Sequence, residues 1–196
     1  AYNVIILANG SPTEPLSPAA LPKLKEWVEN GGTLITTGSA YKLTNKAKIT
    51  DFKTLSQGKK KEKVEGNVHI EYKPYHNTAK AKSGIEGVIF NCHLDITSPL
   101  GYGYENPNVA IMKNGTTVMD FSQIKGSSPM QYTKQPYLSG CVSLENIKRI
   151  SNAPASIVSG CGKGNVIWFA DDLNYRSYWF GGTKIFMNAI YFGQLY

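Results

Sequence analysis

The first forty residues alternate between apolar runs and segments rich in turn residues. Residues 3–8 form an almost continuous apolar run, typical of a strand buried on both faces of a parallel sheet. Ser17 can cap a following helix, with Pro18 at its first position. Four apolar residues, all expected to be buried, recur there at helical spacing: Leu21, Leu24, Trp27 and Val28. Residues 33–37 form a β-branched strand, so the order strand, helix, strand predicts a right-handed βαβ unit and an α/β fold class.

The middle of the chain is less regular. Residues 45–83 carry many lysines and few periodic apolar positions, which predicts an irregular Lys-rich insertion with a strand at 68–72. Strands are also indicated at residues 87–94, 109–112 and 116–121. The last two flank Lys113-Asn114-Gly115, and Asn-Gly is a strong hairpin signal. We therefore expect residues 109–112 and 116–121 to pair with each other.

Regular alternation returns in the last third of the chain. Ser143 is predicted to cap a short helix that runs to Ile150. Residues 155–158 and 165–170 form two strands around the turn at 160–164, and because this glycine-rich turn opens no helix it is a hairpin turn and not a phosphate loop. A last amphipathic helix spans residues 183–192, with four residues expected to be buried: Ile185, Phe186, Ala189 and Ile190.

Composition narrows the function classes. The 196 residues are 41% hydrophobic and 18% charged, as in a globular domain. The net charge is +7, but only Arg149 and Arg176 are arginines, whereas phosphate and base readout favour arginine, so no nucleic-acid partner is expected. No apolar run approaches the ~18 residues of a membrane span. Three cysteines lack the spacing of a metal site, and both a Cys141–Cys161 disulfide and free thiols remain open.

Gly38-Ser39 is the sharpest candidate for chemistry. The pair lies on a tight turn from a buried strand into a predicted helix, where backbone N–H groups could stabilise an oxyanion. A hydrolase would also need a base, and none of the three histidines follows a late strand of the sheet: His69, His76 and His93. A helix cap is therefore the favoured role of Ser39, and a catalytic nucleophile is the alternative.

A second polar cluster follows the strand at residues 165–170. It combines carboxylates, an amide, a guanidinium and an indole: Asp171, Asp172, Asn174, Arg176 and Trp179. Ligands of open α/β sheets bind outside the carboxyl ends of strands, so this cluster could hold a carboxylate or a sugar. The favoured alternative is a loop held by an Asp–Arg pair, with Trp179 packed on the domain. His93 with Asp95 supplies too few ligands to predict a metal site.

Two stretches resemble a known family. Residues 27–35 followed by Gly38-Ser39-Ala40 resemble the helix, strand and elbow of class I glutamine amidotransferase-like domains. A series of segments further along resembles the amidotransferase-like domain appended to bacterial secreted zinc carboxypeptidases of the carboxypeptidase A type: residues 98–104, 138–140, 143–146, 162–164 and 169–171, with Asn174, Arg176, Trp179 and Gly181. The resemblance covers most of residues 1–44 and 84–193.

The resemblance implies a three-layer α/β fold: a mostly parallel, flavodoxin-like or amidotransferase-like sheet with antiparallel hairpin extensions. Residues 1–196 would be one such domain, incomplete at its N-terminus and part of a larger polypeptide. The family's nucleophilic Cys is replaced by Ser39, and no His lies near residues 171–174, where the family's His–Glu pair would fall. Glutamine hydrolysis is therefore not expected.

The peptidase zinc motif, His-x-x-Glu with a distant His, is absent from these residues. The resemblance therefore implies a non-catalytic accessory domain, secreted or periplasmic, without its own cofactor. Its partner would be the zinc-binding catalytic domain of the same polypeptide, with a peptide or glycan as a further ligand. The alternatives are a serine hydrolase using Ser39 and a stand-alone sugar- or peptide-binding domain, whose ligand would contact Asp171, Asn174, Arg176 and Trp179.

Overall fold

The computed structural model describes residues 2–10, 16–55, 83–120, 126–177 and 179–196. Its central sheet, sheet A, holds four strands in the order β1-β2-β9-β8: β1 (Val4–Leu7), β2 (Thr33–Thr37), β9 (Gly164–Phe169) and β8 (Ser156–Cys161). The first three strands are parallel, and β8 returns antiparallel through the predicted hairpin. The βαβ unit and the β8–β9 hairpin are thus confirmed.

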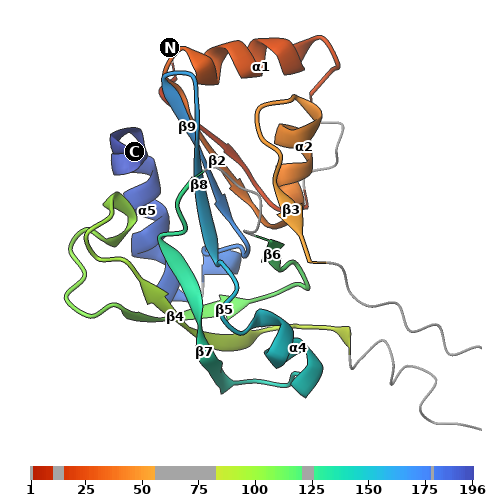
Figure 1. Ribbon diagram of the computed structural model, residues 1–196, viewed down its shortest axis with the longest axis vertical. Coiled ribbons are helices and arrows are strands. Elements are labelled where there is room, and N and C mark those ends of the chain that lie inside the picture. Colours follow the sequence, from red (N-terminus) through yellow and green to blue (C-terminus); the bar gives the residue numbers. More distant parts are fainter. Residues whose placement is uncertain (1, 11–15, 56–82, 121–125, 178) are drawn as a thin grey trace, which may run out of the picture.

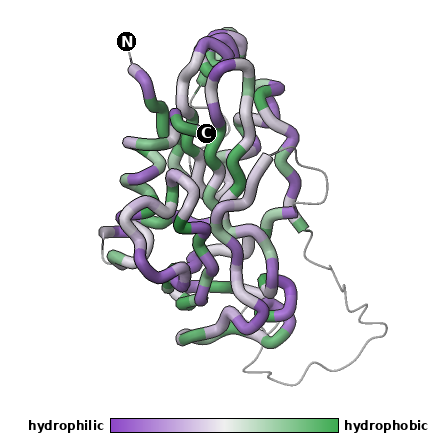
Figure 2. Tube along the Cα trace, turned by 60° about the vertical axis from the view of Figure 1, so that its left-hand side comes forward, coloured by the Kyte–Doolittle hydropathy of each residue, from purple (hydrophilic) through white to green (hydrophobic). Residues whose placement is uncertain are grey.

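Helices cover both faces of sheet A (Figure 1). Helices α1 (Ala20–Glu29) and α2 (Tyr41–Lys46) lie on one face, and α5 (Thr183–Phe192) lies on the other. Both β2 and β9 are buried along their whole length, as their largely apolar or β-branched sequences favour. Figure 2 shows hydrophobic stretches gathered in the strands at the centre of the molecule. The result is the predicted three-layer α/β architecture.

A second, antiparallel sheet packs below sheet A in Figure 1. This sheet C has the strand order β5-β4-β7, formed by β5 (Asn108–Lys113), β4 (Val88–Leu94) and β7 (Met130–Ser139). Its inner face shares one hydrophobic core with α5 and one face of sheet A. Helix α4 (Leu144–Ile150) follows β7 and is capped by Ser143, whose Oγ accepts a hydrogen bond from Asn146 N, as predicted.

The predicted Asn-Gly hairpin is wrong. β5 pairs with β4, while β6 (Met119–Asp120) pairs with β3 (Lys53–Thr54) in a separate two-stranded sheet. Gly115 has a φ of +147° and donates its N–H to Ile85 O, so this turn serves a tertiary contact instead of a two-residue hairpin. The antiparallel part of the fold therefore comes from long-range pairing.

The start of α1 also differs from prediction. The helix begins at Ala20, its N-cap residue is Ala19 without a side-chain cap, and Ser17 contributes only its backbone carbonyl to Ala20 N. Trp27 is half-buried and not fully in the core, because it lies at the rim, where its indole N–H donates to Tyr2 O. Leu21, Leu24 and Val28 are buried as expected.

Two further expectations concern the insertion and the cysteines. Residues 45–55 fold against sheet A, where Phe52 stacks on Trp168, whereas the strand predicted at 68–72 lies outside the described residues. All three cysteines are free. Cys161 ends β8 and Cys141 lies between β7 and α4, and the two do not form a disulfide.

Candidate functional site

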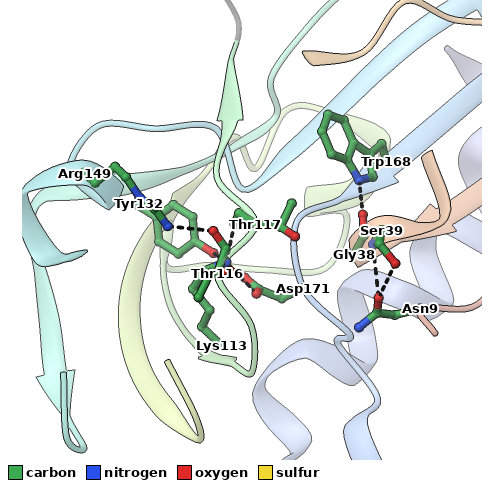
Figure 3. Close-up of polar contacts among 10 residues, drawn as sticks. All are labelled: Asn9, Gly38, Ser39, Lys113, Thr116, Thr117, Tyr132, Arg149, Trp168 and Asp171. Atoms are coloured by element: carbon green, nitrogen blue, oxygen red, sulfur yellow. Dashed lines mark hydrogen bonds and ion pairs between the residues drawn. The ribbon is translucent and has the colours of Figure 1, made fainter. Parts of the chain in front are cut away.

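The elbow after β2 is built on a glycine. Gly38 opens a short 3₁₀ helix, η1 (Gly38–Ala40), with a φ of +52°, a region that L-residues disfavour. A Cβ at this position would lie 2.4 Å from the side chain of Asn9. From the other side, the buried indole of Trp168 donates a hydrogen bond to Gly38 O at 3.0 Å (Figure 3). The turn at Gly38 is thus packed against Asn9 on one side and hydrogen-bonded to Trp168 on the other.

Ser39 faces the side chain of Asn9 (Figure 3). Its backbone N–H and its hydroxyl both donate to Asn9 Oδ1, at 3.0 and 3.1 Å. The N-cap residue of α2 is Ala40, without a side-chain cap, so the favoured prediction of Ser39 as a helix cap is wrong. Among the described residues, the carboxamide of Asn9 is the recorded partner of Ser39 Oγ, and an amide cannot serve as a general base. His69 and His76 lie outside those residues.

A buried charged cluster lies at the end of the neighbouring strand, β9. The carboxylate of Asp171 accepts a hydrogen bond from Lys113 Nζ at 2.8 Å, and Tyr132 Oη donates to its other oxygen. Lys113 Nζ also donates to Thr117 O at 2.7 Å. The side chains of Lys113 and Asp171 are only 0% and 3% exposed. Strands β5 and β7 of sheet C are therefore bonded to the carboxyl end of a strand of sheet A.

Burial raises the pKa values of two neutral groups at this cluster, the Tyr132 phenol and the Cys92 thiol. Desolvation and the negative charge of Asp171 raise the pKa of the Tyr132 phenol well above its usual value. The same two causes, in the same order, raise the pKa of the Cys92 thiol on β4, against a smaller opposing effect of Lys113. Tyr132 therefore acts as a hydrogen-bond donor to Asp171 at neutral pH.

The loop after β9 spreads its polar residues in several directions. Asp171 turns into the core, and its partner is Lys113 instead of the predicted Arg176. Arg176 is exposed, with a φ of +51°, and its guanidinium lies 5.2 Å from the centre of the Tyr175 ring. Trp179 donates its indole N–H to Ala110 O on β5 at 3.0 Å, and Asn174 Oδ1 is buried with no recorded partner among the described residues. Asp171 and Trp179 thus face the fold, whereas Arg176 faces solvent.

Sequence reasoning missed Lys113, Tyr132 and Asn9. Lys113 ends the apolar run of β5, and a lysine in such a run is the one local signal of a buried charge that needs a partner. Neither Tyr132 nor Asn9 stands out in the sequence. No group of three or more His, Cys, Asp or Glu side chains that could hold a metal ion occurs in the described part of the chain. Likewise, no helix described there is long and apolar enough to cross a membrane.

Comparisons with known proteins identify the fold. No family model and no curated protein matches the sequence. A cytoplasmic protein from Salmonella typhimurium is similar in structure, with a TM-score of 0.51 and 15% identity over 97% of this chain and 71% of that protein. A protein from Thermoplasma acidophilum, named for a component of GMP synthase, has a TM-score of 0.50 and 6% identity over 96% of this chain and 71% of its own. At such low identity the likeness concerns the fold alone, and this fold is flavodoxin-like and amidotransferase-like.

Proposed function

We propose that this chain is a non-catalytic accessory domain of a secreted or periplasmic zinc metallocarboxypeptidase, whose catalytic domain cleaves peptides. One observation carries the non-catalytic part. Open α/β sheets hold their ligands beyond the carboxyl ends of the strands, and here the ends of β2 and β9 are occupied by the protein's own side chains. Asn9 engages Ser39, and Lys113 and Tyr132 engage Asp171.

The carboxypeptidase context is supported by the sequence resemblance. The segments that carry it lie on the strands and turns around sheet A and sheet C, from residues 98–104 to the loop that holds Arg176 and Trp179. The zinc ion and the residues that bind it would belong to the catalytic domain. This chain would contribute a surface on which that domain packs, or a site for its peptide or glycan substrate.

The outer side of α5 has the composition of such a surface. Five exposed apolar side chains lie on α5 and the turns that flank it: Phe180, Met187, Tyr191, Phe192 and Leu195. Lys184 is the only charged residue between Phe180 and Tyr196. Its ammonium donates to Gly103 O and lies 4.7 Å from the centre of the Tyr104 ring, so it stays against the domain. Interface cores are depleted in charge and enriched in aromatic residues and Met, which supports packing of the catalytic domain here.

Cysteine labelling tests this packing. Tyr191→Cys on α5 and Leu144→Cys on α4 replace side chains that are 64% and 76% exposed. In a Cys141→Ser, Cys161→Ser background, both new thiols should react with a maleimide in this chain alone. In the parent polypeptide, only the thiol at position 191 should be protected. Equal labelling of both positions in the parent would contradict a docking role for α5.

A second candidate is binding of a cell-wall peptide or glycan at the loop after β9. Arg176 and Ser177 both have positive φ values, +51° and +55°, and such conformations cluster at functional sites. Calorimetry with cell-wall fragments should then detect binding that Arg176→Ala removes and that Lys148→Ala, a change of another exposed cation, leaves intact. Labelling of Ser39 by a covalent serine probe would instead favour the serine hydrolase.

A further inference from the structure

The chain contains three Asn-Gly dipeptides, and the surroundings of two of them are opposite in character. These two are Asn9-Gly10, just after β1, and Asn114-Gly115, just after β5. The third, Asn30-Gly31, follows α1, and its Gly31 N–H donates to Val28 O at 2.9 Å. In an Asn-Gly sequence the glycine nitrogen can attack the carbonyl carbon of the Asn side chain, because glycine has no side chain to hinder the approach. The surroundings of the carbonyl oxygen and of the attacking nitrogen then determine which dipeptide reacts.

At Asn9, the surroundings favour the attack. Oδ1 already accepts two hydrogen bonds, from the backbone N–H and the hydroxyl of Ser39 (Figure 3). These donors point at the oxygen that becomes negatively charged when the carbonyl carbon is attacked, which is the arrangement of an oxyanion hole. Asn9 and Gly10 are both exposed, so water can remove the proton of the attacking nitrogen and carry away the leaving group.

At Asn114, the surroundings oppose it. The nitrogen of Gly115 donates to Ile85 O at 2.9 Å, so its proton is held in a hydrogen bond and is less accessible to water. Both residues are half-buried, next to Lys113 of the buried charged cluster. For Gly10, by contrast, no acceptor of the backbone N–H is recorded within the described residues.

We propose that Asn9 is a site of self-promoted deamidation, driven by Ser39. The Gly10 nitrogen loses its proton to water and forms a bond to Asn9 Cγ, and the resulting oxyanion is held by the two Ser39 donors. The Cγ–Nδ2 bond then breaks, and ammonia leaves with a proton from solvent. Water opens the cyclic imide at either carbonyl and yields aspartate or isoaspartate, so the net change is the gain of one water and the loss of one ammonia.

The product would alter the elbow chemically. An aspartate at position 9 places a carboxylate within hydrogen-bonding distance of the Ser39 hydroxyl, in a part of the molecule where the present partner is neutral. An isoaspartate instead inserts an additional carbon into the main chain and shifts the turn between β1 and the elbow. The elbow would therefore carry a time-dependent change of charge or shape.

Peptide mapping by mass spectrometry tests the proposal. The folded chain is incubated at neutral and mildly alkaline pH, and each Asn-Gly peptide is monitored for the mass difference between OH and NH2 and for isoaspartate. Asn9 should convert faster than Asn114, and faster still at the higher pH. Ser39→Ala should slow the reaction at Asn9 about three- to tenfold, the factor expected for one net hydrogen bond. Ser151→Ala removes another exposed hydroxyl that donates to a backbone carbonyl and should leave the rate unchanged.

Incubation in urea separates the effect of the fold from that of the dipeptide. The Asn-Gly sites then share the reacting dipeptide and have no fixed surroundings, so they should convert at similar rates. Folded protein in which Asn114 converts as fast as Asn9, or a Ser39→Ala variant that reacts at the wild-type rate, would overturn the proposal.

Discussion

The elbow at Ser39 and the buried charged cluster at Asp171 occupy equivalent places but are built in opposite ways. They follow the adjacent parallel strands β2 and β9, whose ends are paired in register at Thr37 and Phe169. The elbow is neutral, and the hydrogen bonds by which Ser39 connects it to the turn at Asn9 are exposed. The buried charged cluster excludes solvent, and its charges come from strands of two sheets. At the carboxyl ends of two adjacent strands, the side chains are thus held in two different ways. Neutral, exposed hydrogen bonds hold the residues after β2, and a buried ion pair holds the residue after β9.

This difference sets the energies involved. Charges removed from water require partners, because losing one partner leaves the other buried and uncompensated. Exposed neutral groups lose little when a partner is removed, since water replaces it. Substitutions at the Asp171 cluster should therefore affect stability far more than substitutions at the elbow.

Asp171→Ala should have the largest effect. It leaves the ammonium of Lys113 fully buried without its carboxylate, and we expect a loss of about 3–5 kcal/mol in the free energy of unfolding. Urea denaturation measures this loss. Asp172→Ala, at the adjacent half-buried carboxylate, is the matched control and should change stability by no more than about 0.5 kcal/mol.

The double variant Lys113→Met, Asp171→Leu checks the cause. Replacing both charges with apolar side chains removes the uncompensated ammonium, so most of the stability lost in Asp171→Ala should return. A double variant as unstable as the single one would mean that the packing of these side chains, and not their charge, is what matters.

Tyr132→Phe should have a smaller effect in the same direction. The change keeps the ring, which packs against Phe90, but removes the hydroxyl that donates to Asp171. We expect a loss of about 1–3 kcal/mol, the range for a buried group left without its hydrogen-bond partner. Tyr137→Phe removes an exposed hydroxyl bonded to Gly140 O and should cost less than about 1 kcal/mol. Equal losses in the two variants would contradict the claim that hydrogen bonds of the buried charged cluster contribute more to stability than exposed ones.

Gly38→Ala tests the backbone of the elbow. The left-handed φ of +52° should cost an Ala about 1–2 kcal/mol, and the added methyl group also displaces the side chain of Asn9. Gly160→Ala lies in β8, with a normal φ and only an ordinary contact of 3.9 Å to Asn165 Oδ1, and should be nearly neutral when both are compared by thermal unfolding. A neutral Gly38→Ala would show that the elbow can relax.

Ser39→Ala should have the smallest effect on stability. Its hydroxyl makes an exposed bond to Asn9, so we expect a loss below about 1 kcal/mol by urea denaturation. A loss as large as that of Tyr132→Phe would mean that the elbow is as fixed as the buried charged cluster.

Local patterns were sufficient to predict much of sheet A and its helices. The strand–helix–strand start, the β8–β9 hairpin and the boundaries of α5 follow from periodicity and turn residues a few positions apart. The pairing of β5 was mispredicted because the Asn-Gly signal competes with its long-range pairing to β4, which no local pattern encodes. Ser17 was mispredicted as a cap because the chain turns once more before α1 begins.

The sequence predicted where the candidate site residues Ser39 and Asp171 lie, but not which side chains they bond to. A strand that ends in Gly38-Ser39 indicates an exposed elbow, and a strand that ends in Asp171 indicates a carboxylate at the same edge. The partners come from far along the chain: Asn9 lies 30 residues before Ser39, and Lys113 lies 58 residues before Asp171. Tertiary packing, which a single sequence does not display, decides which polar groups meet.

The mass and zinc content of the natural product, purified from the cells that make it, test the accessory-domain assignment most directly. We predict a polypeptide much larger than the 21.5 kDa of this chain, with about one zinc ion per molecule. A product of 21.5 kDa without zinc would contradict the carboxypeptidase context. The loop after β9, which holds Arg176, and the elbow at Ser39 would then be the sites to test.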